Sequence, residues 1–363
     1  MAGATRAWDD ATEAEVWYVE PETASKDGYP VGYTYPSDTE STTDTMETIR
    51  SNEVGDFFRV EHGRAFPMYD ELPMALPSDI GEIRRLQIQY TAIKMLIGDT
   101  FDTIMDTHLA PSPDQRRKQV LDVRTQTGLW ADEIAVRFPH VDVKTVDLAP
   151  TIPHMPRANL HHEVYDIHAG IMEPENTFDI IHARHTINMI KDWRTLLKDM
   201  HRVLRPGGIL IFGELDPRLT VPDNYAPALV GPGGRSAAFF EQYRAALSNE
   251  GVLVESCKDI DTWLSPQHAM WATEPGSGFY DIQHQSWEAP LNGLWHPDPR
   301  MQEVGMLMAM NFCEFTKNAR PLFLSSGLSD SEFDNWIEDT WREARDPMNN
   351  LVIRYHAVLA RKI

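Results

Sequence analysis

The pattern of apolar and polar positions predicts that strands and helices follow one another through the middle of this chain. Short runs rich in apolar residues, typical of strands in a buried parallel sheet, occupy residues 120–123, 141–146, 160–165, 178–182 and 209–214. Helical spacing appears between these runs, most clearly at Trp130, Ile134 and Phe138. This order predicts an α/β fold with a mostly parallel sheet.

Further helices are predicted on either side of this region. Before it, an apolar stripe with helical spacing runs from Ile83 through Tyr90, and Ser78 or Asp79 is placed to cap its first turn. After it, residues 217–235 carry many glycines and prolines, which predicts an insertion or lid. The pattern then predicts helices and strands, the last strand antiparallel, at 237–247, 259–271, 279–287, 301–315, 329–345 and 351–359. The complete sheet should have seven strands.

The first strand runs into a turn of the kind that binds a nucleotide, Val-Leu-Asp-Val-Arg-Thr-Gln-Thr-Gly over residues 120–128. In such a turn, glycines let the backbone pass close to the ligand, and a helix begins directly beyond. Gly128 is present, but Arg124 and Gln126 stand where two further glycines are usual, after Asp122 in the strand. A side chain costs most where φ is positive or where the ligand touches the backbone. Turned inward, the side chain of Arg124 would either fill the site or pair with an acidic group of the ligand; turned outward, it would leave a turn that still binds weakly.

Acidic residues follow the next two strands. Asp147 closes the second strand, where a carboxylate can accept hydrogen bonds from both hydroxyls of a ribose. Asp166 follows the third strand, where its carboxylate can accept a hydrogen bond from an amino group or cap its own turn. The turn and the two acids together predict a nucleoside site.

The fourth strand delivers three basic residues to the same edge of the sheet. Arg184 is placed to pair with a carboxylate, either of a ligand or of Glu214 at the end of the fifth strand. His182 and His185 are candidate general bases because the unperturbed pKa of histidine lies near neutrality. The alternative for each is a structural ring bonded to backbone carbonyls; His185 is the better candidate because it lies further into the loop.

Composition and charge narrow the classes of function. The chain has 363 residues and a formal charge of −22, which argues against a nucleic-acid surface, since such a surface needs a basic stripe. No apolar run reaches membrane-spanning length, and the acidic N-terminus lacks the apolar centre of a signal peptide. We therefore expect a cytoplasmic protein, with the nucleus as the alternative. Cys257 and Cys313 lie far apart without metal-ligand spacing, so we expect ordinary thiols and no metal site.

Residues 1–56 form an acidic segment rich in Thr and Ser, with little apolar periodicity, which predicts a solvated arm. Its aromatic residues support the alternative that the arm docks on the body of the protein, on a second copy or on another protein. These aromatics are Trp8, Trp17, Tyr18, Tyr29, Tyr33 and Tyr35.

Taken in order, several blocks resemble class I S-adenosylmethionine-dependent methyltransferases, and more narrowly the fungal LaeA-like methyltransferases. Over roughly residues 57–363 these blocks are His62-Gly63-Arg64, 77–86, Asp166 after Tyr165, 178–184, 204–208, 319–322 and 355–358. The turn departs from the family's Leu-Asp-x-Gly-x-Gly-x-Gly pattern at Arg124 and Gln126. The resemblance implies a Rossmann-like seven-stranded fold with a helical cap and an N-terminal extension, and S-adenosylmethionine as the cofactor, bound weakly, unreactive or lost.

The resemblance also implies roles for residues. The implied cofactor contacts are Asp122, Arg124, Gln126, Gly128, Asp147, Leu148, Asp166, Ile167 and Arg184, and the candidate catalytic residues are His185 and His182. Tyr90, Trp287 and Trp295 are candidates for substrate contacts, with ordinary packing as the alternative. The implied segments are the arm at 1–56, a helical cap at 57–118, the cofactor-binding core at 119–216, and a lid or substrate region with the remaining strands at 217–363.

Three functions fit these residues. The first is methyl transfer from S-adenosylmethionine to a small secondary metabolite, with cofactor binding weakened by the altered turn. The second is a non-methylating enzyme of natural-product biosynthesis on the same fold: a cyclase, pericyclase or isomerase. The third is a LaeA-like regulator acting through protein contacts. Asp147 and Asp166 favour adenosine recognition, because nothing in the fold itself needs carboxylates at both strand ends.

Overall fold

The computed structural model describes residues 4–9, 14–19, 49, 53–69, 75–151, 157–228, 234–346 and 349–363, which fall into an N-terminal unit and a main body. In the N-terminal unit, β1 (Ala4–Asp9) pairs antiparallel with β2 (Ala14–Val19). Two segments of the predicted arm form this pair of strands, and β2 is rich in the β-branched and aromatic residues that favour strands. Tyr29, Tyr33 and Tyr35 lie outside the described residues.

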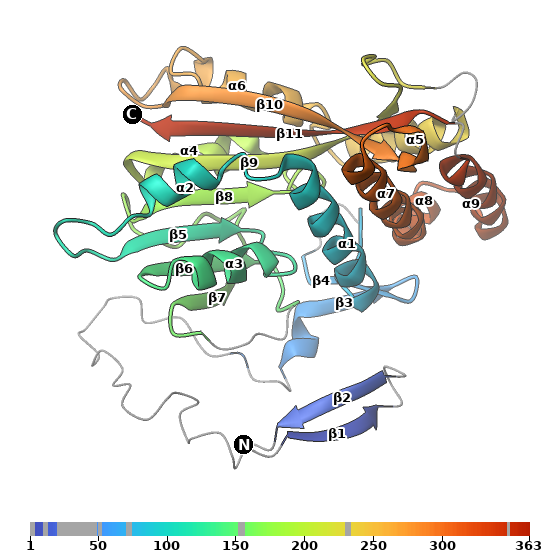
Figure 1. The fold of residues 1–363 in the computed structure, drawn as a ribbon, viewed down its shortest axis with the longest axis horizontal. Helices are drawn as coiled ribbons and strands as arrows, with labels where there is room; N and C mark the ends of the chain where they lie inside the picture. Colours follow the sequence, from blue (N-terminus) through green and yellow to red (C-terminus); the bar gives the residue numbers. More distant parts are fainter. Residues whose placement is uncertain are drawn as a thin grey trace. The chain divides into compact units, whose positions relative to one another are not determined.

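The main body is built on a seven-stranded sheet of order β10-β11-β9-β8-β5-β6-β7 (Figure 1). Its parallel strands are β5 (Lys118–Val123), β6 (Val141–Asp147), β7 (Leu160–Val164), β8 (Phe178–Arg184) and β9 (Leu204–Thr220). The last strand, β11 (Leu351–Lys362), runs antiparallel to both β9 and β10 (Phe279–Leu291). The predicted α/β fold with seven strands and an antiparallel last strand is confirmed.

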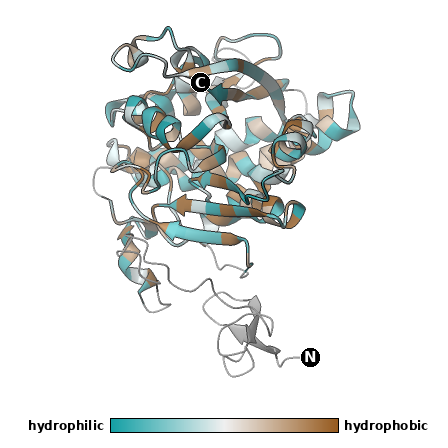
Figure 2. Ribbon diagram, turned by 90° about the vertical axis from the view of Figure 1, so that its left-hand side faces the viewer, coloured by the Kyte–Doolittle hydropathy of each residue, from teal (hydrophilic) through white to brown (hydrophobic). Residues whose placement is uncertain are grey.

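The apolar runs of the sequence lie on these strands, and the colouring of Figure 2 shows hydrophobic stretches along them. On one face of the sheet, Val120 and Ile180 pack in a core that includes Ile134; on the other, Leu121 and Ile181 pack in a core that includes Leu197. Val120 pairs with Ile180 and Leu121 with Ile181, so the two cores follow from the alternation of side chains along paired strands.

Helices cover both faces and the carboxyl ends of the parallel strands. In chain order they are α1 (Ile80–Ile97), α2 (Asp102–His108), α3 (Leu129–Arg137), α4 (Trp193–Val203), α5 (Gly234–Asn249), α6 (Ser256–Leu264), α7 (Pro299–Asn318), α8 (Arg320–Ser325) and α9 (Asp330–Arg345). Three short helical turns, η1 (Val54–Phe57), η2 (Ala269–Trp271) and η3 (Gly293–Trp295), and a hairpin of β3 (Phe58–Glu61) and β4 (Arg64–Pro67) complete the described elements. Helices α1, α5, α7, α8 and α9 gather beyond the carboxyl ends of β5 and β8 (Figure 1).

Most predicted helices form, and the capping residues explain where two of them begin. Asp79 accepts hydrogen bonds from the backbone of Gly81 and Glu82 at the start of α1. Ser329 and Glu332 form a capping box at the start of α9. Among the described residues, no helix combines the length and apolarity needed to cross a membrane.

One predicted helix ends earlier in the structure than the sequence pattern indicates. The helix predicted over 259–271 ends at Leu264, because Pro266 follows and a proline lacks the N–H that a continuing helix would need. The proline and glycines at 205–208 predict the end of a helix, and α4 does end just before them, at Val203; they themselves lie in β9. Residues 229–233 of the predicted lid lie outside the described part of the chain.

Candidate functional site

The turn after β5 has an unusual backbone. Arg124, Gln126 and Gly128 have φ values of 56°, 55° and 68°, so all three positions where glycines are usual adopt the left-handed conformation. For a residue with a β-carbon this conformation costs about 1–2 kcal/mol. The turn therefore keeps the backbone conformation of a glycine-rich loop, although arginine and glutamine replace two of the glycines.

Hydrogen bonds hold this strained turn in place. The N–H groups of Arg124 and Thr125 donate to the carbonyl of Val146 at 2.8 and 3.3 Å, and that of Gln126 donates to Oδ2 of Asp147 at 2.9 Å. Oδ1 of Asp147 accepts from the N–H of Leu148 at 2.8 Å. Burial raises the pKa of Asp147, and the nearby Arg124 opposes that rise. Asp147 therefore fixes the turn through both of its carboxylate oxygens, each of which accepts a hydrogen bond from the backbone.

Two cavities meet at this turn. The Asp147 cavity, about 60 Å³, is lined by Asp147, Leu148 and Thr151, and the Glu214 cavity, about 90 Å³, is lined by Glu214, His185 and Arg85. Both cavities are also lined by Leu76, Glu82, Leu86, Arg124, Gln126 and Asn188. The side chains of Arg124 and Gln126 thus stand between two hollows in the place where a cofactor cleft is expected.

The carboxyl group of Glu214 is buried in its cavity, and one of its two oxygens has no hydrogen-bond partner among the described residues. Its Oε1 accepts hydrogen bonds from the N–H and Oγ1 of Thr186, at 2.5 and 2.7 Å, and from the N–H of Ile187 at 3.1 Å. Its Oε2 is buried and has no hydrogen-bond partner among the described residues, as is also true of Oδ1 of Asn188. Burial raises the pKa of Glu214 to about 7. The cavity therefore offers acceptors that a ligand with N–H donors would satisfy.

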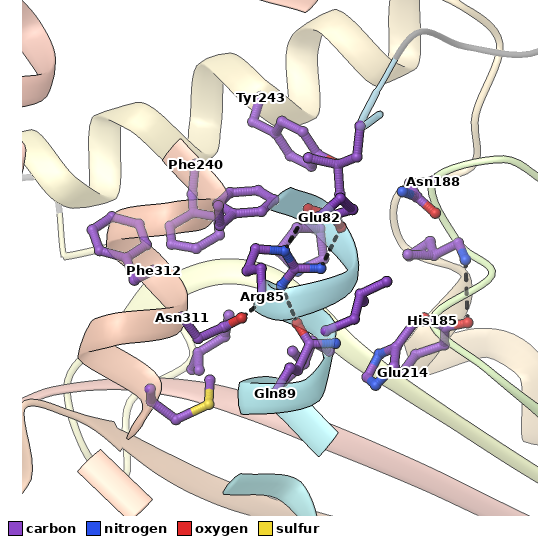
Figure 3. Close-up of a pocket in the computed structure, with 18 of the residues that line it drawn as sticks. Glu82, Arg85, Gln89, His185, Asn188, Glu214, Phe240, Tyr243, Asn311 and Phe312 are labelled. Atoms are coloured by element: carbon purple, nitrogen blue, oxygen red, sulfur yellow. Dashed lines mark hydrogen bonds and ion pairs between the residues drawn. The ribbon is translucent and has the colours of Figure 1, made fainter. Parts of the chain in front are cut away.

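A buried ion pair on α1 forms one wall of the Glu214 cavity (Figure 3). Arg85 donates to both carboxylate oxygens of Glu82, at 2.8 and 2.7 Å, and its Nη1 donates to Gln89 at 2.5 Å and Asn311 at 2.6 Å. Arg85 and Glu82 are each only 3% exposed. Because Asn311 belongs to α7, the network fixes α1 against α7 and engages every nitrogen of the Arg85 guanidinium.

Another part of the lining of the Glu214 cavity is apolar. It is formed by side chains of α5, α7 and the β9 and β11 strands, namely Phe240, Tyr243, Met308, Phe312, Leu219 and Ile353. Figure 3 shows Phe240, Tyr243 and Phe312 along one side of Arg85. The helix predicted over 301–315 thus lines a cavity through Met308 and Phe312. Such a wall suits a largely apolar small molecule.

The predicted catalytic histidines lie in different places. His185 has φ 53°, its N–H donates to the carbonyl of Gly213 at 2.9 Å, and its ring lines the Glu214 cavity. Burial, reinforced by Arg184 and Arg85, holds the pKa of His185 well below its usual value. His182 is bonded through Nδ1 to Oδ1 of Asp122 at 2.7 Å and lines a separate cavity. Only His185 therefore shares a cavity with the turn.

Arg184 also faces that separate cavity, and the predicted alternative of a pair with Glu214 is wrong. Arg184 lies beside Gly213 in the β8–β9 register, and successive side chains of a strand point to opposite faces, so Glu214 is directed away from it. The guanidinium of Arg184 instead lies 4.6 Å from the ring centre of Tyr90. Its role toward a cofactor stays a prediction.

The remaining predicted contacts are placed as follows. Asp166 caps its own turn by accepting from the N–H and Nδ1 of His168, at 2.9 and 3.0 Å. Ile167 is packed in the core, and Asp122 is bonded to Thr125 as well as His182. The ring of Trp287 lies 6.2 Å from that of Tyr355, and Trp295 lies beside His296. Ligand contacts of these residues stay predictions.

The sequence pattern missed the polar wall of α1. Glu82, Arg85 and Gln89 recur at helical spacing between the apolar residues of the same helix. This helical spacing is visible in the sequence, but a polar stripe on a helix is more often exposed to solvent. Only the packing of α7 against α1 shows that these three side chains are buried.

Comparison with known proteins identifies relatives of the chain. The family model of a methyltransferase domain matches residues 99–288. The methyltransferase pytC of Aspergillus terreus is 29% identical over 275 residues, which cover 75% of this chain and 77% of that protein. The secondary metabolism regulator laeA of Coprinopsis cinerea is 26% identical, over 84% of this chain and 74% of that protein. Among solved structures, phosphoethanolamine N-methyltransferase 2 of Haemonchus contortus in complex with S-adenosyl-L-methionine is 17% identical, with a TM-score of 0.41, and the match covers 76% of this chain and 57% of that one.

Proposed function

Because the chain belongs to the methyltransferase-domain family, we propose that it transfers a methyl group from S-adenosylmethionine to a small secondary metabolite, with cofactor binding weakened by its altered turn. The observation that carries this proposal is the turn itself. Its backbone is left-handed at all three glycine positions and is fixed by Asp147, while two of those positions carry side chains between the cavities.

The residues that line the two cavities fit the chemical groups of this family's cofactor, although the side chains of Arg124 and Gln126 reduce the volume available to it. S-adenosylmethionine supplies a methyl group bound to a sulfonium. Asp147 offers carboxylate oxygens for ribose hydroxyls, and the unpartnered oxygens of Glu214 and Asn188 offer acceptors for an ammonium group. Arg124 and Gln126 occupy part of the same space. We therefore expect binding that is measurable but weak.

The remaining residues define what the site can do to a substrate. The apolar wall around Phe240 and Phe312 excludes water and favours an apolar substrate. The ring of His185 has no hydrogen-bond partner among the described residues, and its lowered pKa keeps it neutral, so it can accept a proton from a substrate hydroxyl. Because a group with a low pKa is a weak base, His185 suits an acidic hydroxyl such as that of a phenol or enol.

The side chains of Arg124 and Gln126 also favour a second candidate function. If they keep the methyl donor out altogether, the apolar Glu214 cavity would serve a non-methylating enzyme, a cyclase, pericyclase or isomerase. The chain's relatives also include regulators by name. Product mass separates these functions, because a regulator makes no product and a cyclisation leaves the mass unchanged.

The test combines the purified protein, S-adenosylmethionine with an isotope-labelled methyl group, and a small-molecule extract from a host in which the gene has been deleted. We expect mass spectrometry to show one extract component gaining the labelled methyl group, and Asp147→Asn to reduce that product at limiting cofactor. An isomer of unchanged mass would establish the second candidate and contradict methyl transfer. No new product with the wild-type protein would also contradict it.

A further inference from the structure

A larger cavity lies on the other side of β8 and shares no lining residue with the Glu214 and Asp147 cavities. It measures about 540 Å³, within the range of small-molecule sites. Its walls come from α1, α2, α3 and the strands β8, β9 and β11. We call it the Arg184 cavity, defined by Tyr90, Trp130, His182, Arg184, Ile211 and Tyr355.

Much of this cavity is apolar. Ile93 and Ile97 of α1, Met105 of α2 and Ile134 of α3 contribute aliphatic surface, and Phe101 adds an aromatic ring. The imidazole of His182 stacks on the indole of Trp130, with ring centres 3.8 Å apart and planes within 12°. A ligand there would therefore bury a hydrocarbon body.

One cation in this lining lacks an acceptor. Lys94 pairs with Glu133 at 2.7 Å, and Arg137 pairs with Asp102 and Asp106, both at 2.7 Å. Arg184 forms no hydrogen bond or ion pair within the described residues. Its guanidinium lies over the ring of Tyr90, which orients it while leaving its N–H donors unused.

A second polar group in the lining is His182. Its side chain is almost fully buried, and its Nδ1 is engaged by the carboxylate of Asp122. With Nδ1 donating to Asp122, the other ring nitrogen is an acceptor, and it has no partner within the described residues. His182 can therefore receive a hydrogen bond from a ligand hydroxyl, whereas Arg184 requires an anion.

We propose that the Arg184 cavity is a second ligand site, for a small carboxylic acid with an apolar body whose carboxylate binds Arg184. The planar guanidinium matches a carboxylate through two parallel N–H to O bonds, and the apolar walls take the rest of the molecule. The site does not depend on methyl transfer, since the Arg184 cavity and the cleft around Arg124 have no lining residue in common.

Calorimetry with octanoate, and with octanol as the uncharged molecule of the same chain length, tests this proposal. We expect the wild-type protein to bind octanoate at least about tenfold more tightly than octanol, the effect of a charge-assisted hydrogen bond. Arg184→Met should abolish that preference. The matched control is Lys94→Met, which removes a cation of the same cavity that already has a partner and should leave the preference intact.

Circular dichroism and thermal unfolding show whether each variant is folded, and Arg184→Gln replaces Arg184→Met if the latter is not. Equal affinity for octanoate and octanol, binding of neither, or a preference that survives in the folded Arg184 variant would each overturn the proposal. Displacement of octanoate by S-adenosylhomocysteine would also overturn it, because the acid would then lie in the cleft around Arg124.

Discussion

At the scale of single residues, the left-handed turn is the most informative feature. Arg124 and Gln126 accept a backbone conformation that suits glycine, and the bonds to Val146 and Asp147 force them to keep it. Strained backbone of this kind persists where surrounding structure over-determines it, and it is common at ligand sites. The backbone of the turn thus retains the shape of a ligand-binding loop, but the side chains of Arg124 and Gln126 fill part of the space that a ligand would need.

The strain at Gln126 can be measured directly. Gln126→Gly should be more stable than Gln126→Ala by about 1 kcal/mol, because both remove the same side chain but only glycine adopts a φ of 55° without strain. Urea unfolding of the two variants gives the difference. Equal stabilities, or a more stable alanine variant, would show that the turn is not strained.

Glu214 should make the stability of the protein depend on pH. In the folded protein its carboxyl keeps its proton up to a pKa of about 7, whereas in the unfolded chain it loses the proton near the ordinary value of 4.5. The contribution of this group to the free energy of unfolding therefore falls as pH rises between these values, by about 3 kcal/mol in all.

The isosteric variant Glu214→Gln does not titrate and keeps an oxygen to accept from Thr186. We expect the wild type to lose stability relative to this variant between pH 5 and pH 8, measured by urea unfolding at each pH. A difference between the two proteins that stays constant over this range would refute the raised pKa.

At the scale of elements, the sequence predicted most of the fold because its strands are apolar runs and its helices have clear periods. β6 and β8 occur where the runs lie, and Asp79 caps α1 as its sequence position indicated. The polar wall of the site was not predictable in this way. Whether Arg85 is solvated or buried depends on α7, which lies more than 200 residues further along the chain.

The other differences from the prediction arise from side-chain direction and helix packing, which the sequence pattern does not show. A pair between Arg184 and Glu214 was one of two predicted alternatives, because both residues lie at one sheet edge, but side-chain direction depends on the register between β8 and β9. The grouping of His182 with Arg184 in one cavity and of His185 with Arg124 in another likewise depends on how α1 and α3 pack.

The buried pair on α1 should be a large contributor to the stability of the cap. Arg85→Met leaves the carboxylate of Glu82 buried, with Asn318 as the one other side chain that bonds it within the described residues. We expect a loss of about 3–5 kcal/mol in the free energy of unfolding, measured with urea. The double variant Glu82→Gln with Arg85→Met should recover part of this loss, because no uncompensated charge is left. A double variant as unstable as the sum of both single variants would contradict this explanation.

At the scale of the whole molecule, helix α1 lines both the Glu214 cavity and the Arg184 cavity. Its residues up to Gln89 supply Glu82, Arg85 and Gln89 to the Glu214 cavity, and the following residues supply Tyr90 and Ile93 to the Arg184 cavity. The sheet and the family membership explain why the cleft lies at the carboxyl ends of β5 and β8. The sheet and the family do not determine whether this cleft has room for a cofactor, because that depends on the side chains of Arg124 and Gln126.

The central claim is that this cleft keeps the backbone of a cofactor site and is narrowed by two side chains. Calorimetric titration with S-adenosylhomocysteine tests it most directly, on the wild type, on Arg124→Gly with Gln126→Gly, and on Gln115→Gly. The last is the control, since Gln115 is exposed and also has a positive φ, of 61°, but lies outside the cleft. We predict weak binding by the wild type and by Gln115→Gly, and binding at least about tenfold tighter by the double glycine variant. No heat of binding with the wild type at millimolar ligand, or an affinity unchanged by the two glycines, would contradict the account.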